Sequence, residues 1–517
     1  MTWAQPEDLV GHELRQAVED GRAAAAEPLL RTWLAAGGRP APARAGSSPS
    51  PASPGLRALA EHLLTALDSL PLPLAADEPL SWPAITATWP EPATGPSRPD
   101  PLPWPDGPAR ASGAAAPAPA PAAPGRSGPG TVAAGEAPPS HGGARPASEA
   151  AAGPGSPVAG APRSEGADGL SRMLEAAWTG RAVGCVLGKP VEKLPLEGIR
   201  ALARATGNWP LDDWFTAEGV PAELLAAYPW NRHSAATSLA ENIDGTPEDD
   251  DLDYPLLNLL LLRRHGKRFT TADVARLWLD ELPAGRAFTA ERLAYRNLLL
   301  GLEPPATATR HNPFREWIGA LIRADVHGWT NPGDPTAAAA QAYRDAALTH
   351  TGNGLYAALF TAAAIAEAVG GRADIHSALR AGLAVVPPRS RLAGAVRDAV
   401  DAAARHTDFD RVVDHLHARH GHYHWVHAVP NTALIAAALT HADGDFTRSV
   451  CRAVSGGWDT DSNGATAGSL AALVDGNGVP HRWSAPLKNR LATTVRGFDG
   501  IGFDTLAQLT AQEAVRP

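Results

Sequence analysis

Apolar residues recur along most of the chain at the three- and four-residue spacing that is typical of helices. In residues 1–75, Leu9, Leu14 and Val18 share one helical face. Farther along, long Ala- and Leu-rich segments such as 355–369 alternate with short polar connectors. Because β-branched residues form no convincing series of alternating runs, the pattern predicts an all-α protein.

Composition divides the chain into three parts. Residues 1–75 form a small helical segment, 76–165 a linker rich in Pro, Ala and Gly, and 166–517 a dense helical domain. The linker cannot bury enough apolar surface to offset the entropy lost on ordering, so we expect it to be disordered. The first segment is predicted either to dock a partner protein or to pack on the main domain, and packing is the favoured interpretation.

Charge and cysteine content narrow the class of protein. The chain has 517 residues and a net charge of -10, which argues against a protein that binds nucleic acid through its phosphates. Two cysteines allow at most one disulfide, so nothing requires an oxidising compartment. The N-terminus lacks the features of a secretory signal, and the longest strongly apolar run, Leu256–Leu262, is too short to cross a bilayer. We expect a cytoplasmic protein without a membrane partner.

The stretch Ser455–Gly464 carries the first candidate chemistry. Asp459 and Asp461 stand two residues apart, and side chains at this spacing point to the same side of a loop or extended backbone. With the hydroxyl of Ser462 they form a set of hard oxygen ligands, which suits Mg²⁺, Mn²⁺ or Ca²⁺ rather than zinc. The alternative is a solvated turn in which Ser462 or Asn463 caps the following helix.

A second acidic cluster, Glu248–Asp251, precedes the apolar run Leu256–Leu262. Since Pro255 is tolerated only in the first turn of a helix, the carboxylates lie at or just before a helix N-terminus. Capping explains one or two acids there, but the three successive aspartates Asp249–Asp251 repel one another unless a cation neutralises them. A solvated acidic cap is the alternative. Two such clusters, each opening an apolar helix, predict a binuclear divalent-metal site inside a helical bundle.

Other motifs supply further candidates. Gly184 and Gly188 permit close helix contact, Pro190 ends that helix, and Glu192 projects beyond it as a candidate general base or gate. The Gly-, Pro- and Asn-containing loops at 328–335 and 350–354 have backbone N–H groups that can cradle phosphate. The histidines at positions 422, 424 and 427 match no zinc spacing, so they are interpreted as a pocket wall.

These motifs resemble the ADP-ribosylglycohydrolase family over about residues 170–490. The resemblance rests on both acidic clusters, on the G-x-P-x-E stretch that ends at Glu192, on Leu348-Thr349-His350, and on the final GGWDTDSNGATAG. It implies an all-α orthogonal helical bundle with a cleft that holds two Mg²⁺ or Mn²⁺ ions. The first 165 residues are not covered.

The match to the family pattern is incomplete. The family's Thr-Asp-Asp motif falls on Asp249–Asp251, with an aspartate in place of threonine. A shift by one residue onto Glu248–Asp250 also fits, but it spoils the apolar phase of the helix that follows. The family's usual Gly-Asp pair reads Gly184-Cys185, and Trp458 is inserted before Asp459. These departures indicate a divergent subgroup.

The resemblance implies a divalent-metal-dependent hydrolase that cleaves the glycosidic bond between ADP-ribose and an acceptor, such as an ADP-ribosylated protein. Two alternatives stay open: a catalytically silent ADP-ribose-binding module, and a metal-dependent hydrolase of another nucleotide-like metabolite. Residue by residue, the resemblance and the motifs assign metal binding to Asp249, Asp250, Asp251, Asp459, Asp461 and Ser462, catalysis to Glu192, Asp250 and Asp461, and substrate binding to His350, Gly352, Asn353, Gly354, Trp425 and Gly457.

Overall fold

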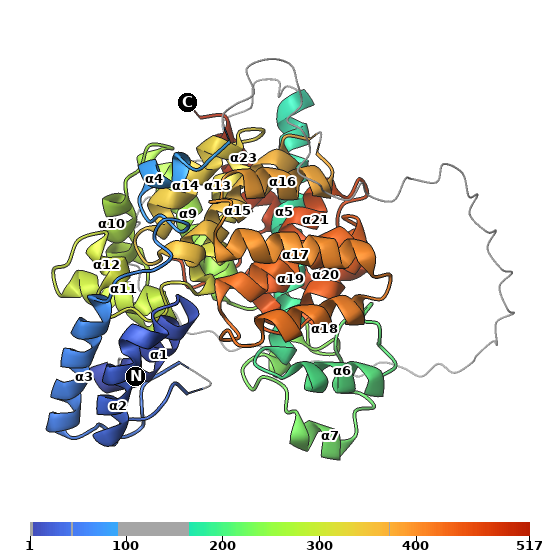
Figure 1. Ribbon diagram of the computed structural model, residues 1–517. Coiled ribbons are helices and arrows are strands. Elements are labelled where there is room, and N and C mark those ends of the chain that lie inside the picture. Colours follow the sequence, from blue (N-terminus) through green and yellow to red (C-terminus); the bar gives the residue numbers. More distant parts are fainter. Residues whose placement is uncertain (1–3, 43–44, 91–164, 372, 517) are drawn as a thin grey trace, which may run out of the picture. The chain divides into compact units, whose positions relative to one another are not determined.

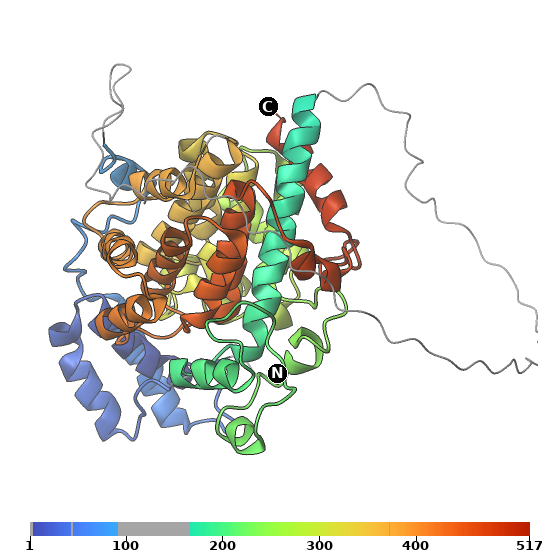
Figure 2. The ribbon, with the colours of Figure 1, turned by 90° about the vertical axis from the view of Figure 1, so that its right-hand side faces the viewer.

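The computed structural model describes residues 4–42, 45–90, 165–371 and 373–516, which all belong to one compact unit (Figures 1 and 2). Over these residues the chain forms α-helices and short 3-10 helices, and the only β-structure is a set of isolated bridges. The all-α class predicted from the hydrophobic pattern is therefore confirmed. Most of the predicted linker, residues 91–164, lies outside the described residues.

The helices follow one another with short connectors. The N-terminal ones are α1 (Pro6–Glu19), α2 (Ala23–Ala35), α3 (Pro54–Asp68) and α4 (Trp82–Thr86). Those of the first half of the main domain are α5 (Glu165–Gly188), α6 (Leu196–Ala205), α7 (Ala222–Ala227), α8 (Ala235–Ser238), α9 (Asp250–His265), α10 (Thr271–Glu281), α11 (Thr289–Leu299), α12 (Ala306–Thr309) and α13 (Asp325–Trp329). Those of the second half are α14 (Pro335–Ala346), α15 (Gly352–Val369), α16 (Ile375–Ala384), α17 (Arg391–Arg405), α18 (Phe409–His420), α19 (Ala428–Ala442), α20 (Phe446–Ser455), α21 (Thr460–Val474), α22 (His481–Ser484) and α23 (Phe503–Ala514). Four 3-10 helices, η1 (Lys189–Val191), η2 (Ala284–Arg286), η3 (Ile318–Arg323) and η4 (Ala485–Leu487), complete the set.

Helix α15 forms the centre of the domain. It is apolar on all sides, and it packs against α13, α14, α16 and α21 (Figure 1). Among the described residues it is also the one helix that is long and apolar enough to cross a membrane, but 94% of it is buried inside the protein. A helix that is hydrophobic all round and enclosed by other helices is a core helix.

Helices α5 and α21 pack unusually closely because small residues line their contact. A Cβ atom on Gly184 would lie 1.9 Å from the carbonyl oxygen of Gly464, and one on Gly180 would lie 2.4 Å from that of Gly468. At the end of this contact the Thr460 hydroxyl donates to the carbonyl of Gly188 over 2.8 Å. The glycine spacing read from the sequence therefore marks the contact that joins the end of α5 to the start of α21.

The N-terminal segment, here residues 4–90 without 43–44, packs on the main domain through buried charges. Arg315 donates to Glu13 over 2.7 Å and to Asp20 over 3.1 Å, and Arg22 pairs with the same two carboxylates from within the segment. Of the two interpretations offered for this segment, packing on the main domain is the one that the structure shows.

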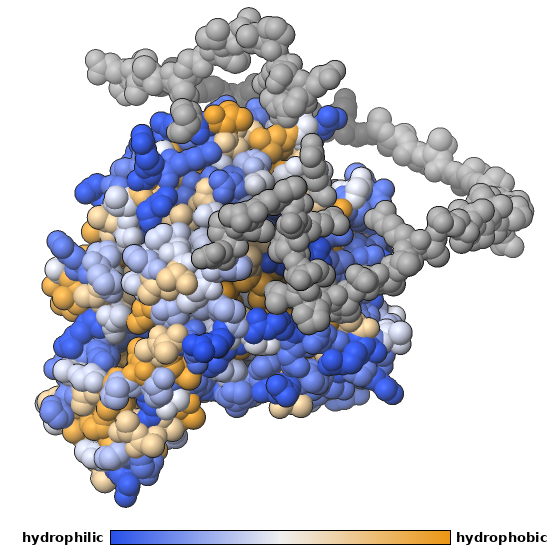
Figure 3. Space-filling view, turned by 45° about the horizontal axis from the view of Figure 1, so that its top comes forward, coloured by the Kyte–Doolittle hydropathy of each residue, from blue (hydrophilic) through white to orange (hydrophobic). Residues whose placement is uncertain are grey.

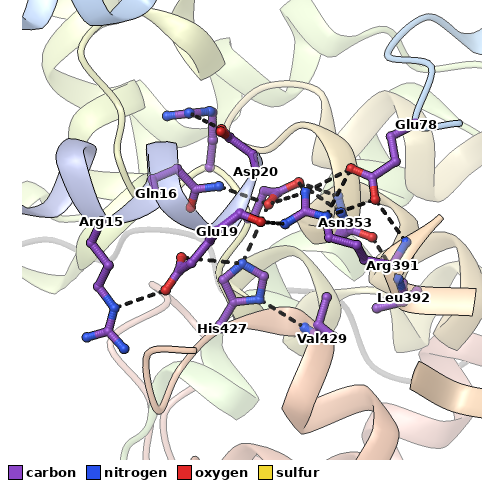
Figure 4. A network of polar contacts seen from close by, with 12 residues as sticks. Arg15, Gln16, Glu19, Asp20, Glu78, Asn353, Arg391, Leu392, His427 and Val429 are labelled. Carbon is purple, nitrogen blue, oxygen red and sulfur yellow. Dashed lines mark hydrogen bonds and ion pairs between the residues drawn. The ribbon is translucent and has the colours of Figure 1, made fainter. Parts of the chain in front are cut away.

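The second centre of this interface is the carboxylate of Glu316. Figure 4 shows the residues gathered around it, among them Gln16, Arg391 and His427. The Glu316 carboxylate accepts from the side-chain amide of Gln16 and from Arg391, each over 2.9 Å, and Arg391 also pairs with Glu78 over 2.8 Å. The Nε2 atom of His427 lies 3.5 Å from the same carboxylate. We call the set Glu13, Asp20, Arg22, Glu78, Arg315, Glu316 and Arg391 the seam.

Residues 76–90, which composition assigned to the linker, are ordered. Besides Glu78, the Trp89 indole donates to the carbonyl of Val385 over 3.0 Å, and the Tyr356 hydroxyl donates to the carbonyl of Pro79. Ile85 is fully buried. Large apolar side chains offset the entropy of ordering this stretch, which its proline content alone would not predict.

The surface shown in Figure 3 is mostly hydrophilic, with small groups of hydrophobic residues between the polar ones. The apolar side chains are instead collected in one core cluster that extends from the N-terminal helices to α23.

Candidate metal site

The first half of the site is the N-terminus of α9. Asp249 caps this helix, with its Oδ1 accepting from the backbone N–H of Asp251 over 2.9 Å. Pro255 lies inside the helix, beyond the first turn where it was predicted, and it has no N–H for the carbonyl of Asp251. The Arg181 Nε atom donates to that carbonyl instead, over 2.7 Å. Because Pro255 leaves this carbonyl without its helical partner, the carbonyl is free to accept from the buried guanidinium of Arg181 next to the acidic cluster.

The N-terminus of α21 supplies the second half. The helix begins at Thr460 with Asp459 as its N-cap, so the alternative in which Ser462 or Asn463 caps it is excluded. Gly457 and Trp458 both have positive φ, at 83° and 56°, and the Trp458 ring stacks on His417 with centroids 3.9 Å apart. The inserted tryptophan is thereby buried on α18, and the turn before it directs Asp459 and Asp461 inward.

Asn431, at the start of α19, holds this turn in place. Its Oδ1 atom accepts from the backbone N–H of Asp459 over 3.1 Å and from the side-chain amide of Asn463 over 2.8 Å. Its Nδ2 atom donates to the carbonyls of Trp425 and His427. Since every polar atom of this buried amide is satisfied, the position of the Asp459 backbone is fixed.

The loop after α5 completes the site. Glu192 lies there, and its Oε2 accepts from the Asn231 side chain over 2.7 Å while its Oε1 pairs with Lys193. One candidate ligand atom each from Glu192, Asp459 and Asp461 lie within 4.8 Å of one another. The same holds for Cys185, Asp249 and Asp251. We call these two sets the downstream group and the upstream group.

Two buried cations lie among these acids. The Lys189 ammonium pairs with Asp249 Oδ2, and Arg181 pairs with Asp251 Oδ1 over 3.3 Å and with Asp325 over 3.0 Å. Sequence analysis did not identify either residue. Arg181 could have been found, because an arginine amid the apolar residues of a helix usually signals a buried ion pair.

The carboxyl groups are difficult to ionise. Burial and the neighbouring carboxylates raise the pKa of Asp250, Asp251 and Asp459 well above the usual value. Burial, Glu192 and Asp249 raise the pKa of Asp461 to about 7. Asp249 differs: burial would raise its pKa, but the ammonium of Lys189 outweighs burial and holds it below the usual value.

The donor set fits a divalent cation. Buried carboxylates that repel one another are stabilised when a cation replaces their protons, and oxygen donors suit Mg²⁺ or Mn²⁺. Ser462, which follows Asp461 in the chain, is buried, and its hydroxyl as a ligand stays a prediction. Asp250, at the first position of α9, lies close enough to Asp249 and Asp461 for their charges to raise its pKa.

The structure also distinguishes the two registers of the upstream motif. The Glu248 carboxylate pairs with Arg286 over 2.9 Å, is partly exposed and belongs to neither group of candidate ligands. Asp249, by contrast, occupies the capping position, and the helix starts at Asp250. The register that begins at Asp249 therefore places its three carboxyl groups in or beside the cluster, whereas the shifted register does not.

The predicted substrate residues separate into two sets. Trp425 lies beside the cluster, since the Lys193 ammonium that pairs with Glu192 is 5.7 Å from the centre of its ring. Gly457 belongs to the turn that carries Asp459. His350 lies elsewhere: it is buried, and its Nδ1 atom is 2.6 Å from the Thr349 hydroxyl, in a polar network with Arg323. A substrate would reach this ring only after its surroundings moved.

The turn Gly352–Gly354 holds an anion of the chain itself. The backbone N–H and the side-chain amide of Asn353 both donate to Glu316 Oε1 over 3.0 Å. A Cβ atom on Gly352 would lie 2.3 Å from the same oxygen. Because Glu316 already occupies these donors, a phosphate cannot bind there in this structure. The cradle predicted at this turn exists, but a seam carboxylate fills it.

The two predicted phosphate loops cannot act together. The N–H of Gly333, in the loop 328–335, donates to the carbonyl of Ala366 near the C-terminal end of α15, whereas Asn353 lies at its N-terminal end. At 1.5 Å per residue these positions are roughly 20 Å apart along the helix. The two loops in which phosphate cradles were predicted therefore cannot hold one diphosphate between them.

Comparison with known proteins identifies a family. The sequence model of the family described as ADP-ribosylglycohydrolase matches residues 167–514. No curated protein matches the chain. A solved structure of an ADP-ribosylglycohydrolase-related protein complex is similar at 20% identity and a TM-score of 0.41, covering 67% of this chain and 99% of that one.

Proposed function

This chain belongs to the ADP-ribosylglycohydrolase family, and from that premise we propose that it is a divalent-metal-dependent hydrolase of the glycosidic bond between ADP-ribose and an acceptor. Membership of the family supports a hydrolase of ADP-ribose linkages in general. The metal dependence is supported by the acidic cluster, whose oxygen donors come from α9, α21 and the loop after α5.

Each part of the site has a role in this proposal. Asp250, Asp459, Asp461 and Ser462 hold the cation, which supplies the positive charge that orients the ribose hydroxyl groups. Glu192, positioned by Asn231, takes the proton from the water that attacks the anomeric carbon. The acceptor leaves with its bonding electrons as positive charge develops on the ribose ring. Trp425 provides an aromatic face at the mouth of the site for the adenine ring.

The observation that carries the proposal is the position of Glu192. A glutamate with a carboxylate oxygen within 4.8 Å of those of two buried aspartates is poorly explained as a structural group, because it adds a like charge to a cluster that already repels itself. In a hydrolase it places a proton acceptor beside the cation that orients the substrate.

The test is release of free ADP-ribose from arginine-, serine- and phosphate-linked conjugates, measured with Mg²⁺, with Mn²⁺ and with EDTA. Asp461→Asn removes a proposed ligand, and Glu248→Gln is the matched control, since it removes a neighbouring carboxylate that faces Arg286. Substituting a residue that only supports a metal ligand typically lowers metal affinity or activity by about 10–100-fold, and substituting a direct ligand should lower it more. We therefore expect release to fall by at least roughly 100-fold in Asp461→Asn.

The alternatives predict other outcomes. Release that persists in EDTA would contradict the metal dependence. Tight binding of ADP-ribose without release from any conjugate would instead indicate a binding module, and release from an unrelated nucleotide alone would indicate a different substrate class.

A further inference from the structure

The upstream and downstream groups differ in how their charges are compensated. In the upstream group, Asp249 pairs with Lys189 and Asp251 pairs with Arg181, and both cations are buried. In the downstream group, Glu192 pairs with Lys193, whose side chain is 37% exposed. Over the described ranges, neither Asp459 nor Asp461 has a lysine or arginine within ion-pair distance. The protein thus supplies buried cations to both aspartates of the upstream group, whereas the two aspartates of the downstream group have no such partner.

Asp249 has little capacity left for a metal ion. Its Oδ1 accepts from the N–H of Asp251, and its Oδ2 accepts from Lys189. The Lys189 ammonium also lies 3.5 Å from the carbonyl oxygen of Glu248. The third member of the upstream group is the thiol of Cys185, which is a poor donor for Mg²⁺ or Mn²⁺. The upstream group therefore lacks the free oxygen donors that a second hard cation needs.

Lys189 is held where it is by the fold. It follows Gly188, whose Cα lies so close to α21 that an added Cβ would be 2.3 Å from the carbonyl oxygen of Thr460. Pro190 follows it as the second residue of the 3-10 turn Lys189–Val191. With both neighbours constrained in this way, the lysine side chain extends from the end of α5 toward the capping residue of α9, and only 10% of it is exposed.

We propose that this site holds one divalent cation, in the downstream group, and that the Lys189 ammonium takes the place of a second. This inference rests on the proposed function and departs from the two ions that the resemblance implies. The positive charge of the Lys189 ammonium neutralises Asp249, so no metal ion is needed to compensate the charge at that position.

The test counts bound Mn²⁺ on the full-length chain, by equilibrium dialysis with elemental analysis and by electron paramagnetic resonance. We expect one ion per chain and the six-line spectrum of isolated Mn²⁺. Two ions per wild-type chain, with the multiline spectrum of a coupled pair, would overturn the inference.

Variants test whether Lys189 is what excludes the second ion. Lys189→Met frees Asp249 Oδ2, and the double variant Lys189→Ala/Asp249→Thr removes both charges while the threonine still caps α9. We expect a second Mn²⁺ and a coupled spectrum in both variants, and no change in Glu248→Gln. Melting curves identify any variant that fails to fold. If the folded variants still bind one ion, Lys189 is not the excluding group and the inference fails.

The two proposals fail separately. Two ions per chain together with release of ADP-ribose would overturn only the single-ion inference. One ion per chain without release from any conjugate would overturn only the proposed function, and a chain that binds no Mn²⁺ would overturn both.

Discussion

The acidic site and the seam are both buried groups of charged residues, yet their carboxylates behave in opposite ways. Burial alone would raise the pKa of Glu13 and Glu316, but the arginines that face them hold both values below the usual one. Burial and neighbouring carboxylates raise the pKa of Asp250 and Asp459. Of these four buried carboxylates, the two that pair with arginines keep a low pKa, whereas the two that face other carboxylates do not.

We expect the largest difference between the two regions to be the loss of unfolding free energy when a seam carboxylate is neutralised. Glu316→Gln leaves the Arg391 charge with only Glu78 as an ionic partner, and losing one partner of a buried network destabilises a protein by about 3–5 kcal/mol. Chemical unfolding of the variant measures this loss. Glu248→Gln, whose carboxylate is partly exposed, should change stability by less than about 0.5 kcal/mol. Equal losses in both variants would contradict the comparison.

At the acidic site we expect a smaller change in the opposite direction, namely a gain in stability when a cation binds. A cation that binds only the folded chain stabilises it by about 2.7 kcal/mol at one hundred times its dissociation constant. We therefore expect Mn²⁺ to raise the melting temperature of the wild type and EDTA to reverse the increase. Asp461→Asn should lose most of this response, whereas Glu316→Gln should keep it, because the seam holds no uncompensated acid cluster. A response of the same size in Asp461→Asn would contradict the assignment.

Acid pH should weaken the seam. Since the folded-state pKa of Glu316 lies below its usual value of 4.5, its contribution to stability is complete above pH 4.5 and is lost as pH falls through the lower, folded-state value. The difference in unfolding free energy between wild type and Glu316→Gln should therefore be constant from pH 7 to 4.5 and shrink below. A difference that grows toward acid pH would show that the sign is wrong.

The smallest effect is expected from an exposed ion pair of the same interface. Arg389 pairs with Asp77 over 2.7 Å, but the arginine side chain is 74% exposed. Exposed pairs contribute about 0–1 kcal/mol and are screened by salt. Arg389→Ala should leave the melting temperature nearly unchanged, and raising the salt concentration should remove any residual effect. A loss comparable to that of Glu316→Gln would mean that proximity to the seam matters more than burial.

Local patterns in the sequence predict much of this molecule. The helical class follows from the spacing of apolar residues, the start of α9 from its acids, and the close contact of α5 and α21 from Gly184 and Gly188, whereas Pro255 lies beyond the first turn in which it was predicted. The acids of Asp249–Asp251 and of Asp459–Asp461 are brought together as predicted, since each opens a helix whose other end is fixed by the core. Their roles as ligands stay a prediction.

What the sequence does not predict depends on distant partners. The turn at Gly352–Gly354 has the features of a phosphate cradle, and only the fold shows that Glu316 fills it. From the sequence alone, Lys189 is simply one residue of a loop. Its partner Asp249 lies sixty positions away, and only the fold shows their contact. Single-sequence patterns report which groups a segment offers, but the partner that satisfies each group is set by tertiary packing.

The seam also sets an order of events on the ribosome. Glu13 and Arg22 are 9 residues apart and can pair soon after they emerge, whereas the amide of Gln16 meets Glu316 across 300 residues of sequence. At synthesis rates of roughly 5–20 residues per second, that partner arrives about 15–60 s later. The helices of the N-terminal segment are therefore made well before their main-domain partners, and until those partners emerge the charges that this segment presents to the interface stay incompletely paired.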